Sequence, residues 1–144
     1  MKPDSNFDGL KLENQLCFPL YAASREVIKQ YKPYLDKLNL TYTQYIAMLL
    51  LWENKTMTVK EMGEHLYLDS GTLTPLLKKL EAKGFINRVR STEDERNLNI
   101  TITKAGEKLK EQATEIPVKI HEGTKLSKEE LEGFYKTLYT ILKK

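Results

Sequence analysis

The stretch from Thr58 to Ile102 decides the fold and reads TVKEMGEHLYLDSGTLTPLLKKLEAKGFINRVRSTEDERNLNITI. Thr58 followed by Glu61 has the form of a capping box, which predicts a short helix to about Leu66. Residues 67–69 predict a tight turn into a second helix, from about Ser70 to Lys83. Two helices joined by so short a turn are typical of a helix-turn-helix.

The second helix is amphipathic, and its two faces differ in chemistry. The apolar positions recur at i, i+3, i+4 and i+7, and they are Leu73, Leu76, Leu77 and Leu80. The opposite face carries Gly71, Pro75, Lys78, Lys79 and Ala82, flanked by Thr72 and Thr74. A helix with small residues, hydroxyls and lysines on its exposed face can enter a DNA major groove and contact phosphates at the margins.

Gly84 predicts the end of that helix. The residues after it alternate as expected of a two-stranded ribbon. Leu98, Ile100 and Ile102 alternate with polar residues, and residues 86–91 form the expected partner strand, with residues 92–97 at the tip. The ribbon carries the cations Arg88, Arg90 and Arg96. Helix, turn, helix and basic ribbon in this order predict a winged helix-turn-helix.

Charge is concentrated in this segment. Between residues 78 and 90 five cations accompany one anion, Glu81, which is typical of a phosphate-binding surface. Taken alone, the ribbon could instead be an ordinary hairpin whose charges are solvated and do not bind phosphate. The whole chain has a net charge of only +3, so the case for nucleic acid depends on the local cluster.

Composition indicates one small intracellular domain. The chain has 144 residues, of which 40% are hydrophobic and 30% charged, so it can bury a core. We recognise no signal peptide, and the longest apolar run, residues 46–52, is too short to cross a bilayer. We therefore expect a cytoplasmic protein that does not contact membranes.

Signatures of enzymes and metal sites are largely missing from the sequence. It contains no nucleophile elbow, no P-loop and no glycine-rich nucleotide fingerprint after a strand. One cysteine and two distant histidines do not make a Cys/His metal cluster. We expect no catalytic residue, no cofactor and no metal.

Helices are predicted on both sides of the winged module. The first runs from about residue 14 to 38 and is bent or interrupted by Pro33. The next is capped by Thr43, with Ile46, Leu49 and Leu50 pointing inward and Trp52 packed near its end. Another opens at Thr103, continues through Ile120 and is kinked near Pro117.

The last predicted helix has a complete apolar stripe that needs a partner. Ser127 with Glu130 caps it, and the stripe consists of Leu131, Phe134, Tyr135, Leu138, Ile141 and Leu142. Because a single winged module reads few base pairs, we expect a homodimer built from both chain ends. The predicted architecture is mainly α with a small β-hairpin. It is one domain over residues 1–144, with a winged core at about 43–103 and dimerisation helices at about 12–38 and 104–144.

Cys17 is the only thiol. A lone cysteine on an apolar helix side is usually a small buried hydrophobe. Here it falls in the first turn of a predicted helix, where the dipole and the unpaired amides favour a thiolate. Tyr21 follows one turn later, and Tyr31 and Tyr42 carry phenols that could stabilise a thiolate if a dimer brings them near.

Three stretches resemble the organic hydroperoxide sensing repressors of the MarR class. They are LENQLCFPLYAASREVIKQYKPYLDKLNLTYTQY (12–45), LYLDSGTLTPLLKKLE (66–81) and RSTEDER (90–96), and the similarity is weaker after the wing. The resemblance implies a homodimeric winged-helix repressor that binds a pseudo-palindromic operator on double-stranded DNA when reduced. It also implies release of that operator when an organic hydroperoxide oxidises the amino-terminal cysteine.

The resemblance also assigns residues. Cys17 matches the peroxidatic cysteine, Tyr31 and Tyr42 match tyrosines that reach the cysteine of the opposite subunit, and Tyr21 matches a nearer tyrosine. The start of the recognition helix is matched by Asp69, Ser70, Gly71, Thr72 and Thr74. Asp94 and Arg96 match the acidic and arginine pair of the wing, whose arginine enters the minor groove.

Some members of that family have a second cysteine, which this chain lacks. Oxidised Cys17 would stop at the sulfenic acid, react with a backbone amide, pair with a low-molecular-weight thiol, or be overoxidised. Two other functions remain open. One is a regulator of the same fold that binds phenolic compounds, and the other is a thiol peroxidase using Cys17.

Overall fold

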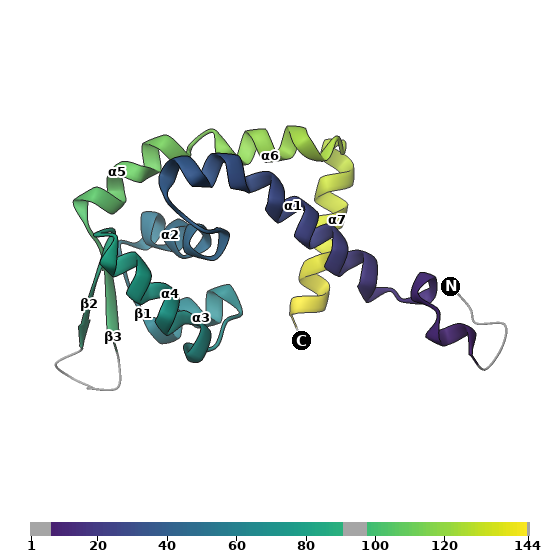
Figure 1. Ribbon diagram of the computed structural model, residues 1–144, viewed down its shortest axis with the longest axis horizontal. Coiled ribbons are helices and arrows are strands. Elements are labelled where there is room, and N and C mark those ends of the chain that lie inside the picture. Colours follow the sequence, from purple (N-terminus) through teal and green to yellow (C-terminus); the bar gives the residue numbers. More distant parts are fainter. Residues whose placement is uncertain (1–6, 91–97, 144) are drawn as a thin grey trace. The chain divides into compact units, whose positions relative to one another are not determined.

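The computed structural model describes residues 7–90 and 98–143, which belong to two units. Unit 1 combines the two chain ends, up to Tyr31 and from Ile116 onward, and unit 2 is continuous from Lys32 to Glu115. The elements are labelled in Figure 1, apart from two short 3₁₀ turns, η1 (Asp8–Leu10) and η2 (Leu12–Asn14). They are α1 (Cys17–Leu38), α2 (Tyr42–Asn54), β1 (Thr56–Thr58), α3 (Val59–Leu66), α4 (Ser70–Ala82), β2 (Ile86–Arg90), β3 (Leu98–Ile102), α5 (Lys104–Ala113), α6 (Ile116–Thr124) and α7 (Lys128–Leu142).

The helix-turn-helix of unit 2 is confirmed. The Thr58 hydroxyl caps α3 by accepting a hydrogen bond from the Glu61 backbone N–H at 3.1 Å. Tyr67 then takes the left-handed conformation with φ of 57°, and α4 begins three residues later. The four leucines predicted for the inner face of α4 are all buried. Gly84, with φ of +85°, lies just beyond the end of α4, as predicted.

The ribbon has a third strand that the sequence analysis missed. The strand order is β1-β3-β2, antiparallel throughout, with Met57 and Arg88 both paired to Ile100 on the central strand. β1 is only three residues long, so its alternation gives too little signal to recognise. Ser91 and the predicted tip at 92–97 lie outside the described residues.

Helix α2 passes through the middle of the core, but it differs from the prediction in two respects. Its cap is Thr41, not Thr43: the Thr41 hydroxyl accepts from the Gln44 N–H, and the Gln44 side chain accepts from the Thr41 N–H. Leu49 is exposed and Ile46 and Leu50 are half-buried, whereas the buried apolar residues are Tyr45, Ala47, Met48, Leu51 and Trp52. The helix is apolar on nearly every side, so periodicity alone could not select the inner face.

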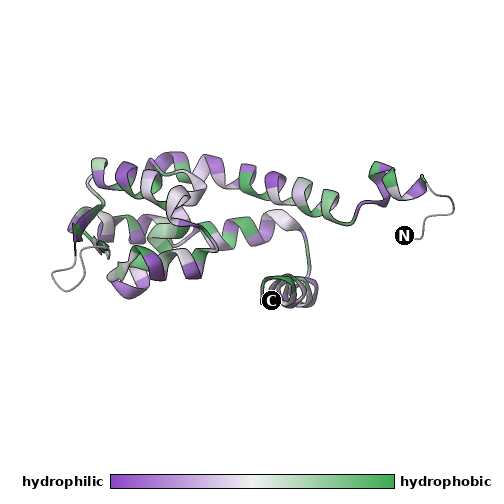
Figure 2. Ribbon diagram, turned by 90° about the horizontal axis from the view of Figure 1, so that it is seen from below, coloured by the Kyte–Doolittle hydropathy of each residue, from purple (hydrophilic) through white to green (hydrophobic). Residues whose placement is uncertain are grey.

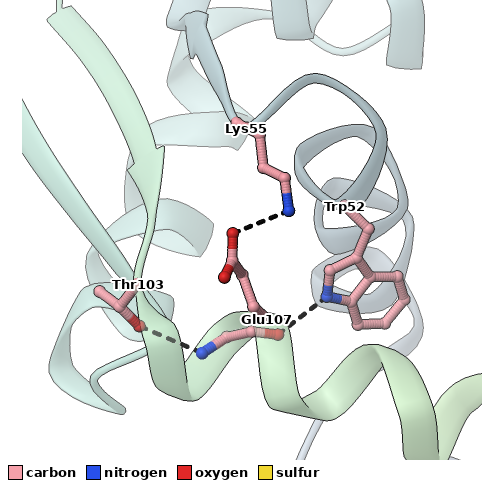
Figure 3. Close-up of polar contacts among 5 residues, drawn as sticks. Trp52, Lys55, Thr103 and Glu107 are labelled. Carbon is pink, nitrogen blue, oxygen red and sulfur yellow. Dashed lines mark hydrogen bonds and ion pairs between the residues drawn. The ribbon is translucent and has the colours of Figure 1, made fainter.

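The C-terminal end of α2 is joined to the start of α5 (Figure 3). The indole N–H of Trp52 donates to the Gly106 carbonyl at 2.9 Å, which confirms that Trp52 packs near the end of its helix. Thr103 caps α5 by accepting from the Gly106 N–H at 3.1 Å. Lys55 and Glu107 form an ion pair at 2.7 Å, but both side chains are largely exposed, so the pair contributes little stability.

Gly106 is the tightest point of this junction, so we expect Gly106→Ala to destabilise unit 2. A Cβ at that position would lie 2.3 Å from the Phe85 carbonyl oxygen and 2.8 Å from an Ile102 side-chain carbon. Overpacking of this kind costs about 1–3 kcal/mol. Gly133→Ala in α7 is the matched control, because nothing lies within 4 Å of its added methyl. Urea unfolding at one protein concentration should show a lower midpoint for Gly106→Ala alone. Equal midpoints would contradict this account of the junction.

The helices of the two chain ends also depart from the prediction. α1 begins at Cys17 rather than near residue 14, and it continues through Pro33 without interruption. The single kinked helix predicted after Thr103 is two helices, α5 and α6. Pro117 explains the break, because it has no N–H to donate to the Ala113 carbonyl and is tolerated only in a first turn.

Unit 1 buries little of its apolar surface. Ile116 and Ile120 are its only buried hydrophobic residues among those described. Hydrophobic residues recur along its helices (Figure 2), and α7 has the predicted capping box but no buried residue. Within the described ranges, no helix has the length and hydropathy needed to cross a membrane.

Candidate nucleic-acid interface and thiol site

The N-terminal end of α4 is held by its cap. The Asp69 carboxylate accepts a hydrogen bond from the Thr72 backbone N–H at 2.7 Å. That bond lowers the pKa of Asp69, so the carboxylate stays charged at the positive end of the helix dipole. Asp69 therefore stabilises the first turn of α4 as its N-cap, and a DNA contact by this side chain remains a prediction.

The outer face of α4 is exposed and short of bulky side chains. Ser70, Gly71 and Thr72 in its first turn are exposed, and Thr74 is half-buried. Pro75, Lys78, Lys79 and Ala82 continue the exposed face toward the C-terminal end. The face predicted for DNA is therefore accessible along its whole length.

A close approach of α3 sets the position of α4. A Cβ on Gly63 would lie 2.7 Å from the Leu68 carbonyl oxygen and 3.3 Å from the Leu73 side chain. The Leu68 N–H also donates to the Gly63 carbonyl at 3.0 Å. The absence of a side chain at Gly63 thus allows the turn and the first turn of α4 to pack directly onto α3.

Arg88 and Lys83, both counted in the basic segment, have partners inside unit 2. Arg88 contacts Glu81 through its guanidinium at 3.1 Å and its backbone N–H at 3.0 Å, and both bonds lower the pKa of Glu81. Lys83 donates to the Asn39 carbonyl at 2.6 Å and to the Gln44 side-chain oxygen at 2.8 Å. A count of cations along the sequence did not show that Arg88 and Lys83 bind acceptors of the same chain. Only Gln44 could have been noticed, because the Thr41–Gln44 spacing has the form of a capping box.

Three further cations of the basic segment have exposed side chains. Lys78, Lys79 and Arg90 are exposed, and they lie on α4 and on β2. Asp94 and Arg96, predicted for the wing, lie outside the described residues. Within the described ranges, no group of three or more His, Cys, Asp or Glu residues could hold a metal ion.

Cys17 is exposed at the first position of α1, unlike the buried cysteine that is usual on an apolar helix side. Backbone N–H groups in this turn and the helix dipole favour an anion there. Tyr21 lies one turn further along and is exposed, with the Arg25 guanidinium 5.5 Å from its ring centre. A small oxidant can therefore reach this thiol.

The other two tyrosines are not adjacent to Cys17 along α1. Tyr31 is half-buried and follows Cys17 by fourteen helical residues, a distance of about 21 Å along the axis at 1.5 Å per residue. Tyr42 begins α2 in unit 2, and burial raises the pKa of its phenol. The Tyr42 hydroxyl therefore stays protonated near neutral pH and can donate a hydrogen bond.

The chain is similar to known transcriptional regulators. The family model described as transcriptional regulator SarA/Rot matches residues 29–113. The organic hydroperoxide resistance transcriptional regulator of Bacillus subtilis (strain 168) is 60% identical over 139 residues, covering 96% of this chain and 95% of that protein. The match thus extends well beyond the wing.

Two solved structures of AbfR are also similar. Reduced AbfR bound to DNA has a TM-score of 0.78 at 37% identity, covering 96% of this chain and 97% of that one. Overoxidised AbfR bound to DNA has the same TM-score at 36% identity, covering 96% and 98%. AbfR has also been solved from Staphylococcus epidermidis. The chain therefore belongs to the SarA/Rot family of transcriptional regulators, and its resemblance to the organic hydroperoxide sensing regulators of the MarR class is confirmed.

Proposed function

We propose that this protein is a redox-gated DNA repressor. A reduced homodimer binds a pseudo-palindromic operator and releases it when an organic hydroperoxide oxidises Cys17. The observation that carries the proposal is an exposed thiol at the start of a helix, in a chain whose α4 presents an accessible DNA-reading face. The name of the Bacillus subtilis relative supports organic hydroperoxides as the signal. Since its target would be DNA, we place its action in the cytoplasm.

The apolar surface of unit 1 supports the homodimer. All large exposed hydrophobics among the described residues belong to unit 1 except Leu49, Tyr67 and Val89. Between α6 and α7 lies a groove of about 780 Å³ lined by Leu126, Leu131 and Tyr135 together with charged residues. Exposed apolar surface on this scale is typical of an interface, and a second copy of the same unit supplies a matching surface.

The spacing along α1 is a second argument for two chains. Because Tyr31 of the same helix is too far along the axis to reach Cys17, any contact between these residues must come from the other subunit. In the family this chain resembles, the two tyrosines reach the cysteine of the opposite subunit. We propose the same for Tyr31 and Tyr42, with the protonated Tyr42 phenol donating to the Cys17 thiolate.

On DNA, the two copies of α4 would occupy successive major grooves. Residues of the exposed face, from Ser70 to Thr74, would approach the bases, and Lys78, Lys79 and Arg90 would contact phosphates. Arg96 would enter the minor groove, with Asp94 beside it. Arg88 would contribute less than the sequence count indicates, since Glu81 neutralises part of its charge.

The chemistry at Cys17 needs one oxidant. The thiolate attacks one oxygen of the hydroperoxide, so an S–O bond forms as the O–O bond breaks, and the departing alkoxide takes a proton to become an alcohol. The resulting sulfenic acid can condense with a small thiol, which gives a mixed disulfide and water. No second cysteine is present to resolve it within the chain.

Release requires a large difference in free energy between the two states. Moving a dimer from almost fully competent to almost fully incompetent takes about 5 kcal/mol. AbfR has been solved on DNA in its overoxidised form, so in that relative overoxidation is compatible with DNA binding. For this chain we therefore favour loss of the thiolate–phenol contacts together with the bulk of a mixed disulfide as the cause of release.

The experiment is a mobility shift on an inverted-repeat duplex selected from a random pool by the reduced protein. An organic hydroperoxide, added with a small thiol such as free cysteine, should release the duplex. Two further arms test the other functions: aromatic acids without oxidant, and consumption of hydroperoxide with a thiol reductant. Release by aromatic acids alone would favour a phenolic ligand, and sustained turnover would favour a peroxidase. Either result, without release by hydroperoxide, would overturn the proposal.

Lys79→Met should weaken binding to the selected operator and to a scrambled duplex by a similar factor. A phosphate contact carries no sequence information, and its loss should reduce the salt dependence by about one counterion per subunit.

Arg96→Ala should behave differently, costing about 1–3 kcal/mol per half-site on the operator and relaxing the preference for flanking bases. A salt series on both duplexes separates the two effects. Equal losses on both duplexes for Arg96→Ala would withdraw the specificity role of the wing.

A further inference from the structure

We propose that Lys83 is a positioning residue that locks α4 to the corner between α1 and α2, and that opening this lock carries the redox signal to the DNA-reading helix. The source of the signal rests on the proposed function. The lock consists of the Lys83 ammonium, the Asn39 carbonyl and the Gln44 side-chain oxygen. All three belong to unit 2.

The lock joins three helices at one atom. Lys83 is the C-cap residue just after α4, Asn39 follows the end of α1, and Gln44 lies in the first turn of α2. The lysine nitrogen is 2.6 Å from the Asn39 oxygen and 2.8 Å from the Gln44 oxygen. The C-terminal end of the DNA-reading helix is therefore held by the other two helices through two charge-assisted hydrogen bonds.

The Gln44 side chain is restricted by burial and by its cap bonds, so it cannot shift to keep its bond if Lys83 or Asn39 moves. It is the one buried polar side chain within the described ranges, with 3% of its surface exposed. Its side-chain oxygen accepts from the Thr41 N–H at 3.1 Å as well as from Lys83, and its own N–H donates to the Thr41 hydroxyl at 3.3 Å. The acceptor that receives Lys83 is thus fixed to the helix cap of α2.

The lock is better suited to two discrete states than to gradual loosening. Lys83 is half-buried, and burial, with the nearby charge of Lys79, lowers the pKa of its ammonium. A shift of about one ångström between α1 and α2 would take one of the two bonds beyond hydrogen-bond range. A partly buried ammonium left with one acceptor is costly, so it would move to solvent.

Tyr42 connects the lock to the redox site. It is the first residue of α2 and lies two residues before Gln44, between the two parts of the chain that hold Lys83. Under the proposed function, oxidation of the other subunit's Cys17 removes the partner of the Tyr42 phenol. A change at this first turn of α2 alters the position of the Gln44 oxygen relative to the Asn39 carbonyl, and so opens the lock.

The first test labels amines in the wild-type dimer without DNA. A small amine-reactive reagent is applied to the reduced protein and to protein oxidised by organic hydroperoxide with free cysteine, and each lysine is followed by mass spectrometry. In the reduced protein, the two acceptors and burial should make Lys83 react more slowly than the exposed Lys79, outweighing the effect of its lowered pKa. After oxidation, its rate should approach that of Lys79. Cys17→Ser, treated identically, should show no change. Equal rates in the reduced protein, or protection unchanged by oxidation, would overturn the lock.

The second test compares Lys83→Met with Lys79→Met, which removes a charge one turn earlier on the same helix and none of the lock's hydrogen bonds. Reduced Lys83→Met should lose operator affinity by about 3- to 30-fold, the usual range for a coupling residue, and oxidation should weaken it further by much less than it weakens wild type. Lys79→Met should keep the wild-type ratio of oxidised to reduced dissociation constants. Lys83→Arg, which retains donors, should restore most of that ratio.

The outcomes separate the two proposals. If hydroperoxide fails to release wild-type protein from the operator, the proposed function fails, and the lock has no signal to carry. If wild type is released while Lys83 stays protected, or if Lys83→Met keeps the wild-type ratio, the lock alone is wrong. Should Lys83→Met fail to fold, the labelling of wild-type protein still decides.

Discussion

Cys17→Ser is expected to bind the operator as reduced wild type does and to remain bound when hydroperoxide is added. Serine has nearly the size of cysteine and the position is exposed, so the affinity should change by no more than about twofold. The hydroxyl cannot form a sulfenic acid or a disulfide, so the release expected of wild type, about 100-fold or more, should disappear. The measurement is operator affinity with and without hydroperoxide and free cysteine.

A matched control tests whether the place of the thiol matters. The double variant Cys17→Ser, Ser24→Cys moves the only thiol to an exposed position seven residues into α1, away from the first turn. It should not regain release, because it has neither the helix-terminal environment nor the proposed contacts with tyrosines. Release of Cys17→Ser itself by the same treatment would rule out Cys17 as the sensor.

Phe134→Glu is expected to separate the dimer and to abolish tight operator binding. Phe134 is 49% exposed in the single chain, so the chain should still fold, but a carboxylate on the apolar stripe of α7 would have to be buried without a partner in the proposed interface. A monomer engages one half-site, and losing the second linked contact costs about 10²–10⁴ in affinity. Sedimentation and operator titration measure both effects.

Gly133→Glu provides the control for that variant. It adds the same side chain one residue earlier on α7, where nothing lies within 4 Å of the added Cβ and the position faces away from the apolar stripe. It should remain dimeric and bind the operator normally. A dimer that persists in Phe134→Glu, or that is lost equally in Gly133→Glu, would contradict the placement of the interface on the stripe.

The fold was predictable where one helix face is apolar and the other polar. α4 has four buried leucines at strict helical spacing against small and cationic residues, so its limits and its inner face follow from the sequence. α2 is apolar nearly all round, and only its packing against α3, α4 and α5 selects Met48 and Leu51 over Leu49. β1 is recognisable only through its pairing with β3.

Which cations of the candidate site have partners within the fold was not predictable from the sequence. A count of cations treats Lys79, Lys83 and Arg88 alike, whereas the fold leaves the first exposed and gives the other two acceptors from Gln44 and Glu81. Gln44 and Glu81 lie on other elements than the cations they bind, so only the folded chain shows these pairs. The sequence placed Cys17 in a first helical turn, although it set the start of that helix near residue 14, three residues too early.

The most direct test of redox gating follows operator release and thiol chemistry in the same samples. Reduced protein on a fluorescent operator is titrated with an organic hydroperoxide in the presence of free cysteine, and each point is divided between anisotropy and mass spectrometry of Cys17. We predict that the released fraction rises with the fraction of Cys17 modified, and that release is complete by the time both Cys17 residues of each dimer are modified. Operator that stays bound to fully modified protein, or that is released while Cys17 is still a thiol, would contradict the account.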